Sequence, residues 1–234
     1  MTLPKIQYPT TNFTIPSTKK TVKVRPFLVS EEKILLIAKE SKDNAEILGA
    51  IKQVVQNCIV DKTDTNKLTI SDLEYLFVKL RSISVDTIVS ISYIDDEDEK
   101  RYDFEVDLSK VEVKFPEKIN PTISITDNMG LIMKYPSASF YSDKDLLASG
   151  ENYIFELIIR CLDKVYEGDN IYEAKNYSHK DINDFILTLD TKTFEKIRTF
   201  LTNLPRLSHT IKYTNSLGKE KVIELNSLSD FFIW

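Results

Sequence analysis

The spacing of hydrophobic residues changes along the chain, and these changes constrain the fold more than any other feature. Between Ile47 and Ile83, apolar residues recur at helical spacing in two successive stripes, which follow a helix start near Ser30. From Thr87 to Phe115, apolar and polar residues alternate instead, as they do in half-buried strands. The order repeats in the second half, with helical stripes between Ile154 and Leu204 and alternation between His209 and Leu225. The sequence therefore predicts an α+β fold in which two helical groups are each followed by an antiparallel hairpin or meander.

The first helix is predicted to begin where an extended apolar run after Arg25 ends. Ser30 is a suitable cap, and Glu31 complements the positive end of the helix. Val29 is placed to pack against Ile34 from outside the cap as a hydrophobic staple. This segment therefore predicts a helix over about residues 31–40.

Other local signals mark turns and helix starts. Residues 12–15 and 21–27 alternate around a Ser-Thr-Lys-Lys turn and predict a small hairpin. Capping-box spacing is expected to begin three later helices, at Asp43 with Glu46, Ser71 with Glu74, and Ser178 with Asp181.

A composition shift at residues 136–150, which predict a linker with one short helix, marks the best internal boundary. We expect one part over residues 1–135 and another over residues 136–234, and a single packed body remains an alternative. The stripes in 73–83 and 194–204 share one spacing, and a polar-tipped hairpin follows each. A duplicated helix-plus-hairpin module accounts for this, but so does the spacing common to amphipathic helices.

Composition excludes several classes of protein. The 31 basic and 36 acidic residues give a net charge of −5 with no long basic block, so nucleic acid is not an expected partner. The sequence has no 18-residue apolar run and no signal-peptide pattern, so we expect no membrane association and place the chain in a cytoplasm. Cys58 and Cys161 fall on apolar helical faces and are expected to be buried and free.

No catalytic, cofactor or metal site is predicted. The acidic run Asp95–Glu99 lacks the ligand spacing of a calcium loop and is interpreted as a solvated hairpin tip. His179 and His209 have no second ligand or nucleophile at a useful spacing. The five glycines do not form a phosphate-binding or dinucleotide loop. A hydrolase using a pair of carboxylates is the remaining enzymatic alternative, and no spacing favours it.

Aromatic residues near the two ends of the sequence are the candidate partner-binding residues. They are Tyr8, Phe13, Phe231, Phe232 and Trp234. Large apolar side chains at such positions either fold back onto the protein's own core or anchor a partner. Both alternatives stay open.

Several segments carry a resemblance to a known family. They are Leu3-Pro4-Lys5, Arg25-Pro26-Phe27-Leu28-Val29 with Glu31-Glu32-Lys33-Ile34-Leu35, Ala50-Ile51-Lys52-Gln53, Asp72-Leu73-Glu74-Tyr75-Leu76-Phe77, Val106-Asp107-Leu108-Ser109-Lys110-Val111 and the closing run from Leu225. Together they resemble the baseplate hub assembly family of T-even-like contractile-tailed bacteriophages.

The resemblance implies a non-enzymatic tail protein that acts in assembly of the central baseplate hub through contacts with other baseplate or tail proteins. It implies either an assembly factor (a chaperone) or a hub subunit, present in the cytoplasm of the infected bacterium and, for a subunit, in the virion. An adaptor for a host bacterial protein is an alternative. Oligomeric state is not predicted.

Some members of that family, as the resemblance implies, carry cysteine pairs in their hairpins in the manner of a small metal ribbon. The corresponding tips here, Asp95–Lys100 and Asn215–Lys219, contain no cysteine. A structural zinc is therefore not expected, and the hairpins are expected to depend on cross-strand packing.

Overall fold

The structure is a computed structural model that describes residues 6–117 and 120–231. It divides into two compact units, one of Met1–Lys114 with Arg206–Trp234 and the other of Phe115–Pro205. This division differs from the boundary expected after residue 135. The reason is that the strand at Arg206–Thr214 pairs with a strand at Glu112–Lys114, so the C-terminal hairpin belongs to the same unit as the N-terminal half.

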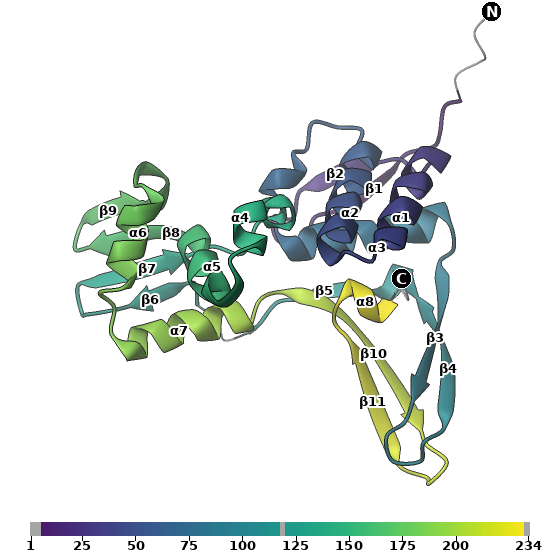
Figure 1. Ribbon diagram of the computed structural model, residues 1–234. Helices are drawn as coiled ribbons and strands as arrows, with labels where there is room; N and C mark the ends of the chain where they lie inside the picture. The colour runs from purple at the N-terminus through teal and green to yellow at the C-terminus, as the bar shows by residue number, and fades with distance from the viewer. Residues whose placement is uncertain (1–5, 118–119, 232–234) are drawn as a thin grey trace, which may run out of the picture. The chain divides into compact units, whose positions relative to one another are not determined.

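The first unit begins with a hairpin and three helices (Figure 1). Strands β1 (Thr11–Thr14) and β2 (Thr21–Val24) pair antiparallel, which confirms the predicted hairpin. The helices are α1 (Val29–Ser41), α2 (Asn44–Cys58) and α3 (Ile70–Ser84), with a 3-10 turn η1 at Thr65–Lys67. The predicted helical stripes supply the core, since Ile51, Val55, Leu73 and Leu76 are all buried.

The start of α1 differs from the prediction. The helix begins at Val29 with Leu28 as its N-cap, so Ser30 lies inside it. The Leu28 N–H donates to the Glu31 carboxylate over 2.8 Å. Val29 is 86% exposed, so the expected staple onto Ile34 does not form. Glu31 replaces the serine cap because the same carboxylate is held in place by an ion pair with Arg25, 3.1 Å away.

The other predicted caps are partly correct. The Asp43 side chain caps α2 by accepting from the Ala45 N–H, 2.7 Å away. In α3 the capping box is Thr69 with Asp72, two residues before the predicted pair. The Asp72 carboxylate also accepts from the Ser17 N–H at 3.0 Å, which fixes the β1–β2 turn against the start of α3.

Strands β3 (Ile88–Ile94) and β4 (Arg101–Asp107) form the predicted hairpin. The predicted meander is wrong beyond that point, because β5 (Glu112–Lys114) pairs with β10 (Arg206–Thr214) and not with β4. A 3-10 turn η2 at Leu108–Lys110 redirects the chain, and the buried Lys79 ammonium donates to carbonyl oxygens of that turn.

The first unit closes with the second predicted hairpin. Strand β10 pairs antiparallel with β11 (Glu220–Leu225), and Gly218 has the expected positive φ of 78° in the turn between them. The short helix α8 (Leu228–Phe231) follows and buries Leu228 and Phe231. The order of α3 before β3–β4 and of α7 before β10–β11 is as predicted; a common origin of the two segments stays a prediction.

The second unit is a four-stranded antiparallel sheet with helices. The strands lie in the order β6 (Thr122–Ser124), β7 (Met129–Met133), β8 (Leu162–Glu167) and β9 (Asn170–Glu173). The helices are α4 (Lys144–Leu147), α5 (Tyr153–Cys161), α6 (His179–Ile186) and α7 (Thr191–Thr202). Three 3-10 turns complete it: η3 (Ala138–Ser142), η4 (Gly150–Asn152) and η5 (Ala174–Asn176).

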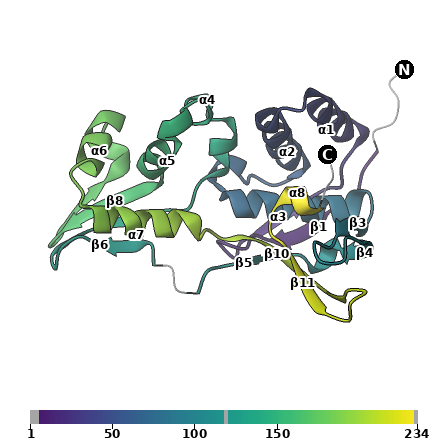
Figure 2. The ribbon, with the colours of Figure 1, turned by 60° about the horizontal axis from the view of Figure 1, so that its bottom comes forward.

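Strands β8 and β9 are the main element that the sequence interpretation missed. The predicted helical stripe extended to Val165, but the helix ends at Cys161 and Val165 lies in β8. The apolar residues within 153–161 have helical spacing even without Val165, so the spacing does not show where the helix ends. Gly168 has a φ of 56° and lies in the turn that connects β8 to β9. The Ser178–Asp181 capping box and the start of α7 after Asp190 are confirmed. Helix α7 runs along β6 in this unit (Figure 2).

Candidate functional site

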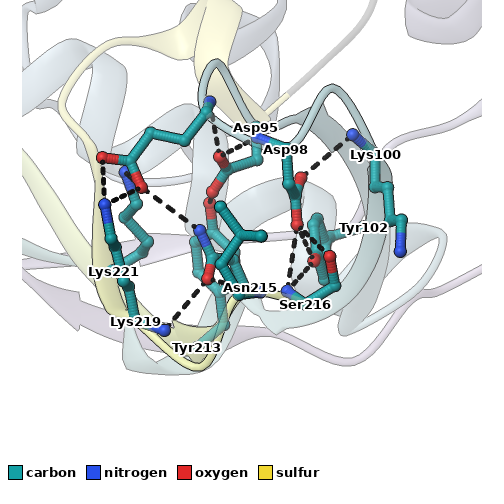
Figure 3. Close-up of polar contacts among 11 residues, drawn as sticks. Asp95, Asp98, Lys100, Tyr102, Tyr213, Asn215, Ser216, Lys219 and Lys221 are labelled. Atoms are coloured by element: carbon teal, nitrogen blue, oxygen red, sulfur yellow. Dashed lines mark hydrogen bonds and ion pairs between the residues drawn. The ribbon is translucent and has the colours of Figure 1, made fainter.

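The tips of the two long hairpins of the first unit meet in a polar network, which we call the tip junction (residues 95–102 and 213–221; Figure 3). Asp95 directly follows β3 as the first residue of the hairpin turn, and it is fully buried. Its carboxylate accepts from the Glu97 N–H at 2.8 Å within the turn, and from the Tyr213 hydroxyl of the other hairpin. Asn215 occupies the equivalent place in the second turn, where its side-chain oxygen accepts from the Leu217 and Lys219 N–H groups.

Asp98 makes the second connection between the tips. Its carboxylate accepts from the Ser216 N–H at 2.9 Å and the Ser216 hydroxyl at 2.8 Å. The Tyr102 hydroxyl donates to the same carboxylate at 2.6 Å. Burial opposes ionisation of Asp98, but these donors outweigh it and hold the pKa of the carboxyl well below its usual range.

Glu97 supplies the charge pairing of the tip junction. Its carboxylate lies 3.2 Å from the ammonium groups of both Lys219 and Lys221. Hydrogen bonds from these two lysines lower the pKa of Glu97. The two cations of the second hairpin thus neutralise part of the acidic run in the first.

Aromatic side chains pack behind the polar contacts. The Tyr213 ring lies 5.0 Å from the Tyr102 ring and 5.3 Å from the Phe104 ring, centroid to centroid. Tyr93 lies 6.3 Å from the same ring in an edge-on arrangement. These spacings are those of attractive aromatic pairs, so tilted and edge-on ring contacts join the hairpins in addition to the hydrogen bonds.

The prediction of a solvated acidic tip is correct only in part, because Asp96, Glu97 and Glu99 are exposed whereas Asp95 is buried. Asp95, Glu97 and Asp98 are paired because a second hairpin, distant in sequence, presents two hydroxyls, a backbone N–H and two lysines to them. The expectation that cross-strand packing alone holds the hairpins is also incomplete. Each of the two turns begins with a polar residue, Asp95 in one and Asn215 in the other, and this was the sequence signal that could have indicated the junction. Residue spacing alone does not show that the two turns are in contact.

The tip junction is a structural connection and offers little reactive chemistry. Hydrogen-bond donors lower the pKa values of Asp95, Glu97 and Asp98, whereas a general acid needs a raised pKa. Over residues 6–117 and 120–231, no group of three or more His, Cys, Asp and Glu side chains is placed to hold a metal ion.

The candidate partner-binding residues lie at different depths. Tyr8 is 42% exposed and Phe13 is half-buried on β1. Phe231 is only 3% exposed, and it lines a groove of about 490 Å³ with Leu36 of α1 and Val85 after α3. Phe232 and Trp234 lie outside the described residues. The three described residues differ in exposure, and their binding role stays a prediction.

Exposed aliphatic side chains on α1 were not selected from the sequence. Leu36 and Ile37 are each more than half exposed, and Val85 and Ile88 are exposed near the same groove. Capping signals in the sequence predicted a helix here, but they do not show which side of the helix is covered.

The cysteines and histidines are not brought together. Cys58 and Cys161 are buried in separate units, as predicted, and burial raises the pKa of each thiol to about 12. The His179 ring lies 2.9 Å from the Glu156 carboxylate on the surface of α5. Burial lowers the pKa of the half-buried His209.

The comparison with protein families decides the identity. The family model described as T4 bacteriophage base plate protein matches residues 8–233 of the chain. The chain belongs to this family. The predicted resemblance to phage baseplate proteins is thereby confirmed at the level of the family. Searches of curated proteins and of solved structures found no match.

Membership gives the chain a structural or assembly role in the phage base plate, with other phage proteins as partners and the tail base plate as its location. Within the part of the chain that the structure describes, no helix has the length and apolar character needed to cross a bilayer.

Proposed function

We propose that this base plate protein acts without enzymatic activity in assembly of the central hub, through contacts with other hub or tail proteins, as an assembly factor or as a hub subunit. The observation that carries the proposal is the exposed aliphatic surface beside the α1 groove. Leu36, Ile37, Val85 and Ile88 are each at least two-fifths exposed. Clustered exposed apolar side chains of this kind are typical of interaction sites.

The titratable groups support a role without catalysis. The carboxylates of Asp95 and Asp98 accept hydrogen bonds within the fold, and their pKa values are lowered and not raised. The thiols of Cys58 and Cys161 are buried, with pKa values far above neutral, so neither forms a thiolate nucleophile at pH 7.

A pull-down from infected cells tests the contact role. Full-length tagged protein is expected to capture hub or tail proteins, and Leu36→Glu is expected to weaken that capture because it places a charge in the apolar surface. Ile94→Glu is the matched control, since Ile94 is 68% exposed on a strand of the same unit. Capture of no hub or tail component by the unmodified protein would contradict the proposal, and a host protein as the dominant partner would indicate an adaptor instead.

Mass spectrometry distinguishes the two forms of the proposal. A hub subunit is expected in purified virions in a fixed ratio to other base plate proteins. An assembly factor is expected in the infected-cell cytoplasm and absent from virions. Both samples should come from the same infection so that expression level does not affect the comparison.

A further inference from the structure

The inner face of the sheet in the second unit loses its cover toward one edge. The strand registers align Ile123, Leu131, Val165 and Tyr172 in one row across β6, β7, β8 and β9. Exposure rises along this row: Ile123 and Leu131 are buried, Val165 is half-buried and Tyr172 is 38% exposed. The apolar core is therefore completed by helices over β6 and β7 but left open beside β9.

The two edge strands of this sheet, β6 and β9, differ in how far other parts of the unit cover them. The β6 edge follows Pro121, lies along α7, and has its Ser124 carbonyl accepting from the Lys196 ammonium at 3.0 Å. Strand β9 contains neither proline nor lysine and pairs only with β8 among the described residues. Its Ile171 is 64% exposed. An edge with unpaired backbone groups and an exposed aliphatic side chain is a template for a further strand.

A groove of about 590 Å³ lies next to this edge, between the inner face of β8 and β9 and helix α6. Its lining is mostly apolar, with contributions from Val165, Tyr172, Ile182 and Phe185. A strand added beside β9 would place alternate side chains on this face, because residues two apart in a strand share a side. Such side chains would extend the row beyond Tyr172 and complete the core.

The charge around the groove indicates the chemistry of the added strand. Residues 162–190 contain seven acidic residues and three lysines, whereas the whole chain has a net charge of −5. Acidic residues therefore outnumber basic ones in this segment by four. Glu167 lines the groove, and in the described structure neither Glu167 nor Asp169 forms an ion pair. A partner carrying lysine or arginine complements this surface.

We propose that the β9 edge binds an extended segment of another base plate protein, which adds a fifth strand to the sheet. Apolar side chains of that segment occupy the groove, and lysine or arginine side chains next to them face Glu167 and its acidic neighbours. This inference rests on the proposed contact function and names one surface and one kind of partner for it.

Site-specific photo-crosslinking in infected cells tests the inference. A photoreactive residue replaces Ile171 in the full-length protein, and Val222 is the matched control, since it is 58% exposed on β11 of the other unit. We expect position 171 to cross-link to a base plate protein within a segment that alternates apolar and other residues and carries lysine or arginine. Position 222 is expected to give no such product. Adding Glu167→Lys to the Ile171 variant should lower the cross-link yield about fivefold.

Several outcomes would overturn the inference. They are a yield at position 171 no greater than at 222, a cross-linked segment that is acidic, and a product formed with a second copy of this chain or with a host protein. If the position 171 variant captures hub proteins in the same cells but gives no cross-link above that of position 222, the surface assignment fails while the proposed function stands. If it captures no phage protein and the unmodified chain also captures none, both fail.

Discussion

Replacement of Glu31 by alanine is expected to destabilise the unit that contains α1 by about 3 kcal/mol. Glu31 is 3% exposed and pairs with Arg25, whose side chain is 20% exposed. Breaking a fully buried ion pair costs about 3–5 kcal/mol, and partial hydration of Arg25 reduces this to about 2 kcal/mol. Loss of the acceptor for the Leu28 N–H adds about 1 kcal/mol, as for a lost helix cap.

Urea unfolding followed by far-UV circular dichroism measures this effect. With a slope of about 2 kcal/mol per molar urea, the midpoint should fall by about 1.5 M. Glu32→Ala is the control, because Glu32 lies in the same helical turn outside the Arg25 pair and should cost about 0.5 kcal/mol. A double-mutant cycle with Arg25→Met should give a coupling of at least about 1 kcal/mol.

The pH dependence provides an independent check. Burial raises the pKa of Glu31, but the hydrogen bonds from Arg25 and the Leu28 N–H outweigh it, so the folded-state pKa lies below the ordinary 4.5. The stabilisation is therefore present above about pH 4.5 and lost as the pH falls through the folded-state value. Wild type and Glu31→Ala should converge in acid. Equal midpoints for the Glu31 and Glu32 variants at pH 7 would refute the reasoning.

Three further predictions concern other parts of the fold. Tyr213→Phe removes the hydroxyl that donates to Asp95, so amide hydrogen exchange should be faster in both hairpin turns. Acid should have the same effect on the wild type. The pKa of Asp95 is lowered in the folded state, so the stability it contributes is lost as the pH falls below about 4. Cys58 and Cys161 should resist iodoacetamide in the native protein and react on unfolding in urea, and rapid native labelling would contradict their burial. Gly130→Ala should destabilise the protein by about 1–3 kcal/mol, because the added Cβ would lie 2.6 Å from the Ile123 carbonyl oxygen. Gly49→Ala on α2 should instead stabilise the protein by about 0.5–1 kcal/mol, because no atom lies within 4 Å of the added Cβ. Thermal unfolding of the two variants tests both expectations.

The sequence by itself determined the features that depend on neighbouring residues. Helical and alternating spacing located α2, α3, both long hairpins and α7, because local periodicity records which side of an element is buried. The cap at Ser178 and the turn at Gly218 were predictable for the same reason, since each depends on a few adjacent residues. The motif around Arg25 was sufficient to indicate the family.

Only the tertiary structure decided which elements meet. Strand β5 pairs with β10 and not with β4, and Asp95 is buried because Tyr213, more than a hundred residues away in sequence, donates to it. The open row that ends at Tyr172 likewise depends on strand order and on where the helices stop covering the sheet. Hydrophobic periodicity predicts which side of a helix or strand is buried, but not which other element packs against that side. Contacts between segments that are distant in sequence depend on the packing of the whole unit.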